Sequence, residues 1–131
     1  MLFRSRDAAA IAIAQKNFEA AQPEAPAKFI HADFREFLAV SGLKPGSVSL
    51  IITNPPLGKR VPIPNMRGLI EDLFRPAARA LKPGGRLVFV NPLRIESPDR
   101  SLELRFRRTI DLGGFNCRLE KYVKAFSSET L

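Results

Sequence analysis

The chain has 131 residues, which suits a single domain, and its hydrophobic fraction of 45% is ordinary for a globular protein. No apolar run approaches the roughly 20 residues that a membrane span requires, so no membrane partner is expected. The chain carries 21 Lys and Arg against 13 Asp and Glu, a net charge of +8 that favours nucleic acid as a partner. The single Cys117 excludes an internal disulfide and is typical of a reduced, cytoplasmic setting, where we expect it as a small strand residue.

The first third of the chain predicts a helix and a short strand. Ala8–Ala21 has apolar residues on one face at helical spacing, with Asp7 as its N-cap. A strand over Lys28–Ala32 leads into Asp33. Residues 34–40 are predicted to form a helical turn.

The middle of the chain predicts a strand, a helix and a second strand. Val48–Thr53 is rich in branched apolar residues and predicts a buried strand. Met66–Leu81 has a continuous apolar stripe, although Pro76 should kink or restart this helix because it lacks a backbone donor. Residues 82–85, Lys-Pro-Gly-Gly, are predicted to stop the helix before a buried strand over Arg86–Val90.

The last part predicts a short helix and a hairpin. Pro98 is placed to begin a helix that runs to about Arg107. Strands over 109–112 and 118–126 follow, joined through a turn at Gly113-Gly114, and residues 127–131 read as a tail. Helices and strands that alternate in this way predict an α/β fold, with a mainly parallel sheet and an antiparallel finish.

Two polar residues each follow a predicted strand. Asp33 comes after the first of these strands and Asn54 after the second. Ligands of open α/β sheets gather at the carboxyl ends of strands. We therefore expect a binding site that includes both residues.

The sequence Asn54-Pro55-Pro56 is difficult to explain by packing alone. Two prolines in succession have no backbone N–H, so the loop offers carbonyl acceptors that are held rigidly. The Asn54 side-chain oxygen and the Pro55 carbonyl are able to accept both hydrogens of a planar amino group. Such a pair would draw the nitrogen lone pair out of conjugation and direct it towards an electrophilic methyl group. A strand end that turns on two prolines for structural reasons is the alternative.

Several segments of the chain resemble class I S-adenosylmethionine-dependent methyltransferases that act on amino groups. The stretch 53–60, Thr-Asn-Pro-Pro-Leu-Gly-Lys-Arg, resembles their Asn-Pro-Pro-aromatic-Gly loop. Within the family, the likeness is to the RNA guanine-N2 branch, whose members often carry a THUMP domain. It extends over residues 7–126 and includes segments 7–17, 32–33, 80–88, 111–115 and 119–120.

The resemblance implies roles for named residues. Asn54, Pro55, Pro56 and Leu57 would form the catalytic loop, with Leu57 in place of the aromatic residue that stacks on the target base. The cofactor S-adenosyl-L-methionine would be contacted by two residues, Asp33 and Asn54. Substrate phosphate would be held by the basic pair that ends the loop, Lys59 and Arg60, for which a solvated loop is the alternative.

Two departures limit the resemblance. The family's Gly-rich cofactor loop follows its first strand, but no glycine precedes Gly42 in this chain. Near Ser5, where the family's second strand should end, there is no carboxylate to hold the ribose. The implied fold is an incomplete Rossmann-like methyltransferase domain over residues 1–131 that lacks the first strand and Gly-rich loop. A second polypeptide that supplies this part, a truncated gene and a late start of the reading frame all fit.

The function implied is methylation of guanine N2 in RNA, either rRNA or tRNA, or descent from such an enzyme with loss of activity. The alternatives are a basic module that binds RNA or a partner without catalysis, and an enzyme that methylates DNA adenine or protein glutamine. The isolated chain is expected to bind the cofactor poorly, because the Gly-rich loop is absent.

Other candidate residues have ordinary structural explanations. His31 is expected to be a structural histidine on a strand, and no Cys, His and carboxylate cluster has the spacing of a metal site. A group of basic residues predicts either an RNA-facing patch or a solvated helix face: Arg100, Arg105, Arg107 and Arg108.

Overall fold

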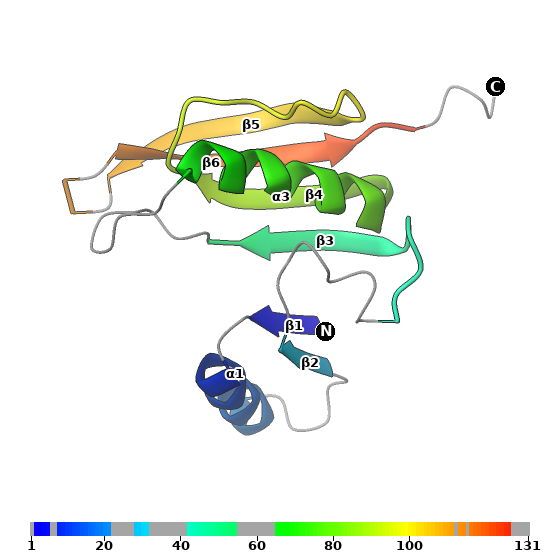
Figure 1. The fold of residues 1–131 in the computed structure, drawn as a ribbon, viewed down its shortest axis with the longest axis vertical. Helices are drawn as coiled ribbons and strands as arrows, with labels where there is room; N and C mark the ends of the chain where they lie inside the picture. The colour runs from blue at the N-terminus through cyan, green and yellow to red at the C-terminus, as the bar shows by residue number, and fades with distance from the viewer. Residues whose placement is uncertain are drawn as a thin grey trace. The chain divides into compact units, whose positions relative to one another are not determined.

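The computed structural model describes residues 2–5, 8–21, 28–31, 42–54, 65–111, 113–114 and 116–126. The chain divides into two compact units, Met1–Leu43 and Lys44–Leu131, each with its own sheet (Figure 1). Within the described ranges, no helix is both long enough and apolar enough to cross a membrane.

The first unit is a strand, a helix and a second strand. β1 (Leu2–Ser5) and β2 (Lys28–His31) pair in parallel, and α1 (Ala8–Ala21) makes the connection that a parallel pair requires. The helix bounds are those predicted, and β2 agrees with the predicted strand to within one residue. β1 ends at Ser5, where the family resemblance places a strand end. The turn predicted over 34–40 lies outside the described residues.

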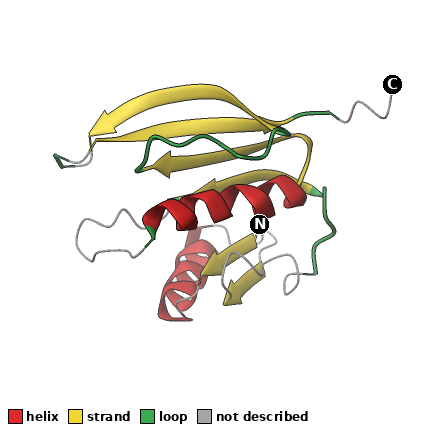
Figure 2. Ribbon diagram, turned by 45° about the horizontal axis from the view of Figure 1, so that its top comes forward, coloured by secondary structure: helices red, strands yellow, loops and turns green. Residues whose placement is uncertain are grey.

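The second unit is a four-stranded mixed sheet with a helix against one face (Figure 2). The strand order is β3-β4-β6-β5, with β3 parallel to β4 and the other two pairs antiparallel. This arrangement confirms the predicted α/β class and its antiparallel C-terminal hairpin. The elements are β3 (Val48–Thr53), α3 (Met66–Ala80), β4 (Leu81–Asn91), β5 (Leu102–Asp111) and β6 (Asn116–Lys124).

The helix α3 supplies one side of the core. The Asn65 side chain caps it by accepting a hydrogen bond from the Gly68 N–H at 3.1 Å. Phe74 lies edge-on to Phe89 at 5.5 Å and to Tyr122 at 5.1 Å between ring centroids, a favoured aromatic geometry. The predicted apolar stripe is confirmed by its buried members, Ile70, Leu73, Phe74, Ala77 and Ala78.

Of the two effects predicted for Pro76, a kink or a restart of the helix, the structure excludes the restart. The helix is continuous from Met66 to Ala80 with Pro76 inside it. A proline in a helix costs one backbone hydrogen bond, but burial of Phe74 and Ala77 on either side holds this helix against the sheet.

β4 begins directly after α3, earlier than the predicted strand. The helix ends before residues 82–85, as predicted, but these residues already belong to an irregular start of β4, where the register with β3 shifts between Val48 and Leu50. Gly84 has a φ of 81°, which glycine adopts without strain. A Cβ on Gly85 would lie 2.9 Å from the Val48 carbonyl oxygen, so this close approach also requires glycine.

The largest correction concerns residues 98–107, which were predicted to be helical. They lead into and form much of the strand β5, which pairs with β6 along its length. Before the strand, Asp99 accepts hydrogen bonds from the N–H and the hydroxyl of Ser101, and this turn replaces the expected helix start. Leu102 is 5% exposed and joins the core, so tertiary pairing outweighs the local helical signal of Pro98.

β3 is less buried than predicted. Leu50 is 41% exposed and Ile52 is 71% exposed. β3 lies at the edge of its sheet, and its only strand partner within the described residues is β4. Its apolar sequence is typical of a strand covered on both faces, but the second unit covers only one.

The hairpin of β5 and β6 turns at two glycines, as predicted. Gly113 and Gly114 have φ angles of 68° and 87°, and the Gly114 N–H donates to the Asp111 carboxylate at 2.6 Å. Cys117 is a buried strand residue, as expected, and burial raises the pKa of its thiol.

Candidate functional site

Asn54 is the first residue after β3, and its side chain is exposed. β3 and β4 are parallel neighbours, with Thr53 level with Phe89, so Asn54 and the end of β4 at Asn91 lie at the same edge of the sheet. We refer to this edge as the carboxyl edge. It is where ligands of open α/β sheets bind.

The structure places one of the predicted site residues. Asn54 is described, and its position at the carboxyl edge agrees with the expectation. The others lie outside the described residues, namely Asp33, Pro55, Pro56, Leu57, Lys59 and Arg60.

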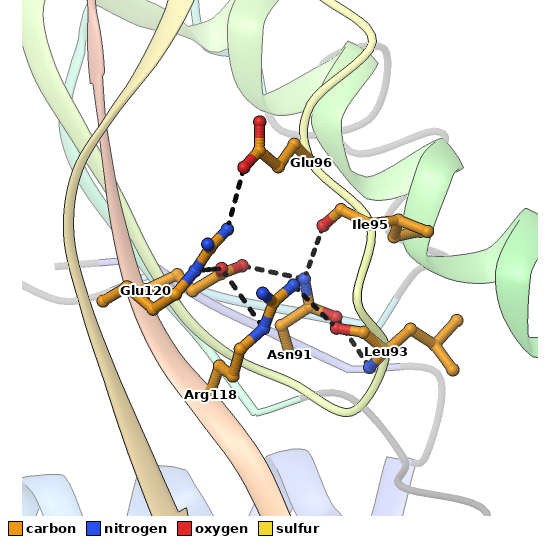
Figure 3. Close-up of polar contacts among 7 residues, drawn as sticks. Asn91, Leu93, Ile95, Glu96, Arg118 and Glu120 are labelled. Carbon is orange, nitrogen blue, oxygen red and sulfur yellow. Dashed lines mark hydrogen bonds and ion pairs between the residues drawn. The ribbon is translucent and has the colours of Figure 1, made fainter.

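A buried polar network occupies the same edge at the end of β4 (Figure 3). Asn91 is fully buried, and its Nδ2 donates to the Ile95 carbonyl at 2.9 Å and to Glu120 Oε1 at 2.8 Å. Its Oδ1 accepts from the Leu93 N–H at 2.9 Å. Both hydrogens of the carboxamide are therefore used, as a buried amide requires.

Glu120 is the centre of this network and is fully buried on β6. Its Oε2 accepts from Arg107 Nε at 2.7 Å, and Arg118 Nε lies 3.7 Å from the same oxygen. Arg107 also donates to Glu96 at 3.1 Å. The hydrogen bond to Glu120 is the main reason why the pKa of Arg107 is raised. A buried carboxylate is costly without such partners, and here two arginines and an amide surround it.

The network fastens the segment that follows β4. Arg118 donates to the Leu93 carbonyl at 3.1 Å, while Asn91 bonds the Leu93 N–H and the Ile95 carbonyl. Glu96 is tied through Arg107. We call Asn91, Leu93, Ile95, Glu96, Arg107, Arg118 and Glu120 the Asn91–Glu120 network.

Tyr122 lies beside this network in the core and is 1% exposed. Burial, and secondly the charge of Glu120, raise the pKa of Tyr122 to about 12. Within the described residues its hydroxyl forms no hydrogen bond of normal geometry, although the backbone of Ser97 weakly favours ionisation.

Sequence reasoning missed the Asn91–Glu120 network. Arg107 was predicted on an RNA-facing patch or a solvated helix face, but it lies on β5 and pairs with Glu96 and Glu120. Arg105, also on β5, pairs with Glu103 at 2.6 Å. No local pattern marks Glu120 as buried, because its chain neighbours are Leu119 and Lys121 and the residues two positions away are Arg118 and Tyr122.

Comparison with known proteins identifies the family. Residues 2–113 match the family model of the methyltransferase small domain. The chain belongs to this family. The matched range includes Asn54 and the whole of β3 and β4. No match was found among curated protein sequences.

Solved structures with the same fold include S-adenosylmethionine-dependent methyltransferases. TrmN from Thermus thermophilus is 25% identical, with a TM-score of 0.72 over 94% of this chain and 36% of TrmN. A methyltransferase from Methanosarcina mazei is 14% identical, with a TM-score of 0.67 over 96% and 82%. The N-methyltransferase NodS from Bradyrhizobium japonicum, in complex with S-adenosyl-L-homocysteine, is 13% identical, with a TM-score of 0.64 over 94% and 65%. The chain thus spans about a third of TrmN and just under two thirds of NodS.

The residues at the carboxyl edge fit one end of a methyl-transfer site. Asn54 is an exposed carboxamide that is able to accept hydrogen bonds from an amino group. The methionine part of the cofactor needs close approach to glycine backbone, and the chain has no glycine before Gly42. Among the described residues, the fit observed is to the amino-group side of such a site.

Proposed function

We propose that this methyltransferase small domain carries the substrate side of an enzyme that methylates the N2 amino group of guanine in RNA, with S-adenosyl-L-methionine as methyl donor. The observation that carries the proposal is the exposed Asn54 at the carboxyl end of β3, beside a parallel β4. The family match and the net charge of +8 support a methyltransferase with a polyanionic substrate.

The part that this chain plays in the reaction is to hold the amino group. The Asn54 side-chain oxygen accepts one hydrogen of the guanine N2 amino group, and the backbone carbonyl of Pro55 is the proposed acceptor for the second hydrogen. S-adenosyl-L-methionine, when bound, supplies an electrophilic methyl group. Holding the nitrogen in one orientation removes much of the entropic barrier, since well-oriented reactants gain roughly 7–11 kcal/mol from proximity.

The test is replacement of Asn54 by Ala in the source organism, followed by mass spectrometry of nucleosides from its rRNA and tRNA. We expect loss of N2-methylguanosine from one RNA position. Asn116→Ala is the matched control, because it removes an exposed carboxamide from the start of β6, which β4 separates from β3 in the sheet. Unchanged N2-methylguanosine in the Asn54 variant would refute the proposal, and loss of a methylated adenine from DNA hydrolysed in parallel would favour the DNA adenine alternative.

We further propose that a second polypeptide contributes to the cofactor side by adding a strand with a Gly-rich loop beside β3. The support is the edge of β3, where Leu50 and Ile52 are exposed and no second strand pairs within the described residues. An exposed, apolar edge strand is a template for addition of another strand.

A photo-crosslinking amino acid at position 52 tests this partner in cells. The expected product joins Ile52 to a different polypeptide that contains a Gly-rich segment, whereas a crosslinker at the solvent-exposed Lys82 serves as the control. Crosslinks from position 52 that reach only residues of this same chain would contradict a second polypeptide.

A further inference from the structure

The segment 92–96 follows β4 at the carboxyl edge, and its backbone is held on both sides of Arg94. On one side, Leu93 is bonded through its N–H to Asn91 and through its carbonyl to Arg118. On the other side, the Ile95 carbonyl accepts from Asn91 at 2.9 Å. Figure 3 shows Leu93 and Ile95 bonded to the Asn91 side chain. The backbone at Arg94 is thus ordered before any ligand binds.

Arg94 differs from the other arginines near this edge. Its side chain is exposed, and no carboxylate of the described residues lies within ion-pair distance of it. Arg107 and Arg118, by contrast, lie against the buried Glu120. An exposed guanidinium on an ordered backbone is available to a ligand and loses little backbone entropy on binding.

The position of Arg94 relates it to Asn54. β3 and β4 run parallel side by side, so the residues that follow them leave the sheet at the same edge. A guanidinium binds phosphate oxygens in a two-pronged geometry, and phosphate contacts fix the register and orientation of a nucleic acid. A nucleotide whose base amino group meets Asn54 has its own backbone phosphates near that edge.

We propose that the Asn91–Glu120 network is a brace that holds segment 92–96 as a wall of the Asn54 site, with Arg94 binding a backbone phosphate of the RNA substrate. This inference rests on the proposed function. Arg94 is the residue that contacts the substrate. Glu120 acts through Asn91 and Arg118 and is a positioning residue.

The first experiment measures binding of a fluorescein-labelled RNA hairpin with unpaired guanines in its loop, by anisotropy across a range of salt concentrations. Arg94→Ala is expected to weaken binding about three- to tenfold and to lower the salt slope by about 0.9, the loss of one phosphate contact. Arg86→Ala is the matched control, because Arg86 is exposed in the middle of β4, away from the carboxyl edge. It is expected to change the affinity about twofold or less.

The second experiment tests the brace. Glu120→Gln is expected to speed hydrogen exchange at the Leu93 N–H, which Asn91 holds, and to weaken RNA binding. If Glu120 acts by placing Arg94, its effect on RNA affinity disappears when Arg94→Ala is already present. Glu96→Gln is a milder second variant, because the Glu96 side chain is 65% exposed and its loss leaves the core intact.

The outcomes separate this inference from the proposed function. Failure of the unaltered chain to bind the RNA would overturn both. RNA binding that Arg94→Ala and Arg86→Ala weaken equally would overturn the role of Arg94 and leave the proposed function standing. Two results would overturn the brace. One is a loss of RNA affinity on Glu120→Gln that is equally large with and without Arg94. The other is unchanged hydrogen exchange at the Leu93 N–H in both Glu variants.

Discussion

The two sides of the β3–β4 pair differ sharply in how they are covered. On the β4 side, Phe74 and Phe89 are buried and Asn91 and Glu120 form a fully buried polar pair. On the β3 side, Ile52 is 71% exposed, and no second strand of the described residues pairs with that edge. The exposed Asn54 lies at the carboxyl edge where the two sides meet.

We propose that this difference corresponds to the substrate side and the cofactor side of a methyltransferase. A rigid region places chemical groups reproducibly, because packing and satisfied hydrogen bonds over-determine their positions. An apolar strand with an open edge lacks that support and is suited to pairing with a further strand. We therefore expect substitutions on the β4 side to affect stability and those on the β3 side to affect association.

The largest contrast in stability is expected between Phe74 and Ile52. Phe74→Ala removes a buried ring that contacts Phe89 and Tyr122, at a cost of about 3–5 kcal/mol. Ile52→Ala should cost about 0.5 kcal/mol or less, because the side chain is largely exposed. Urea denaturation followed by circular dichroism measures both. Similar losses of stability in the two variants would mean that β3 is as well packed as the core between α3 and β4.

A smaller loss is expected at Asn91. Asn91→Ala leaves the Leu93 N–H, the Ile95 carbonyl and Glu120 without one hydrogen-bond partner each, so we expect about 1–3 kcal/mol of destabilisation. The exposed Asn116 is the matched control and should lose no more than about 0.5 kcal/mol. Equal thermal denaturation midpoints for the Asn91→Ala and Asn116→Ala variants would show that the Asn91–Glu120 network does not stabilise the β4 side.

The smallest change in the free energy of unfolding at neutral pH is expected for Tyr122→Phe, because this substitution removes a buried hydroxyl that has no normal hydrogen bond. The effect grows at alkaline pH. Because the pKa of Tyr122 is raised from 10.0 to about 12, its contribution is fully present below pH 10 and is lost as the pH rises through about 12. Between pH 10 and pH 12, the free energy of unfolding of the unaltered chain should fall by about 2 kcal/mol relative to that of the Phe variant.

Absorbance of the tyrosinate ion checks this value directly, since Tyr122 is the single tyrosine of the chain. A midpoint near 10 in the folded protein would mean that the hydroxyl is solvated and that this part of the core is more open than the structure indicates.

The parts of the fold that the sequence predicted depend on local pattern. α1 and α3 follow from helical spacing, and β3 ends at the residue before Asn54, as its apolar run indicated. The prediction of a helix in place of β5 was wrong. Pro98 and the arginines after it form a local pattern typical of a helix, and pairing with β6 outweighs that pattern. Pairing between distant strands is not encoded in any one segment.

The candidate site divides in the same way. Asn54 was predictable, because polar residues at the end of an apolar strand have few packing roles. The partners of Glu120 come from β4, β5 and β6, which are separate segments of the chain, so only the folded sheet brings them together. Strand pairing also explains why Arg107 was misplaced.

We propose that this chain carries the substrate side of a methyltransferase and that a second polypeptide completes its cofactor side. Calorimetric titration of S-adenosyl-L-methionine into the purified chain, with the RNA hairpin titrated in parallel, is the most direct test of this proposal. We expect saturable binding of the RNA and no heat of binding for the cofactor. Saturable binding of S-adenosyl-L-methionine by the chain alone would contradict the proposal.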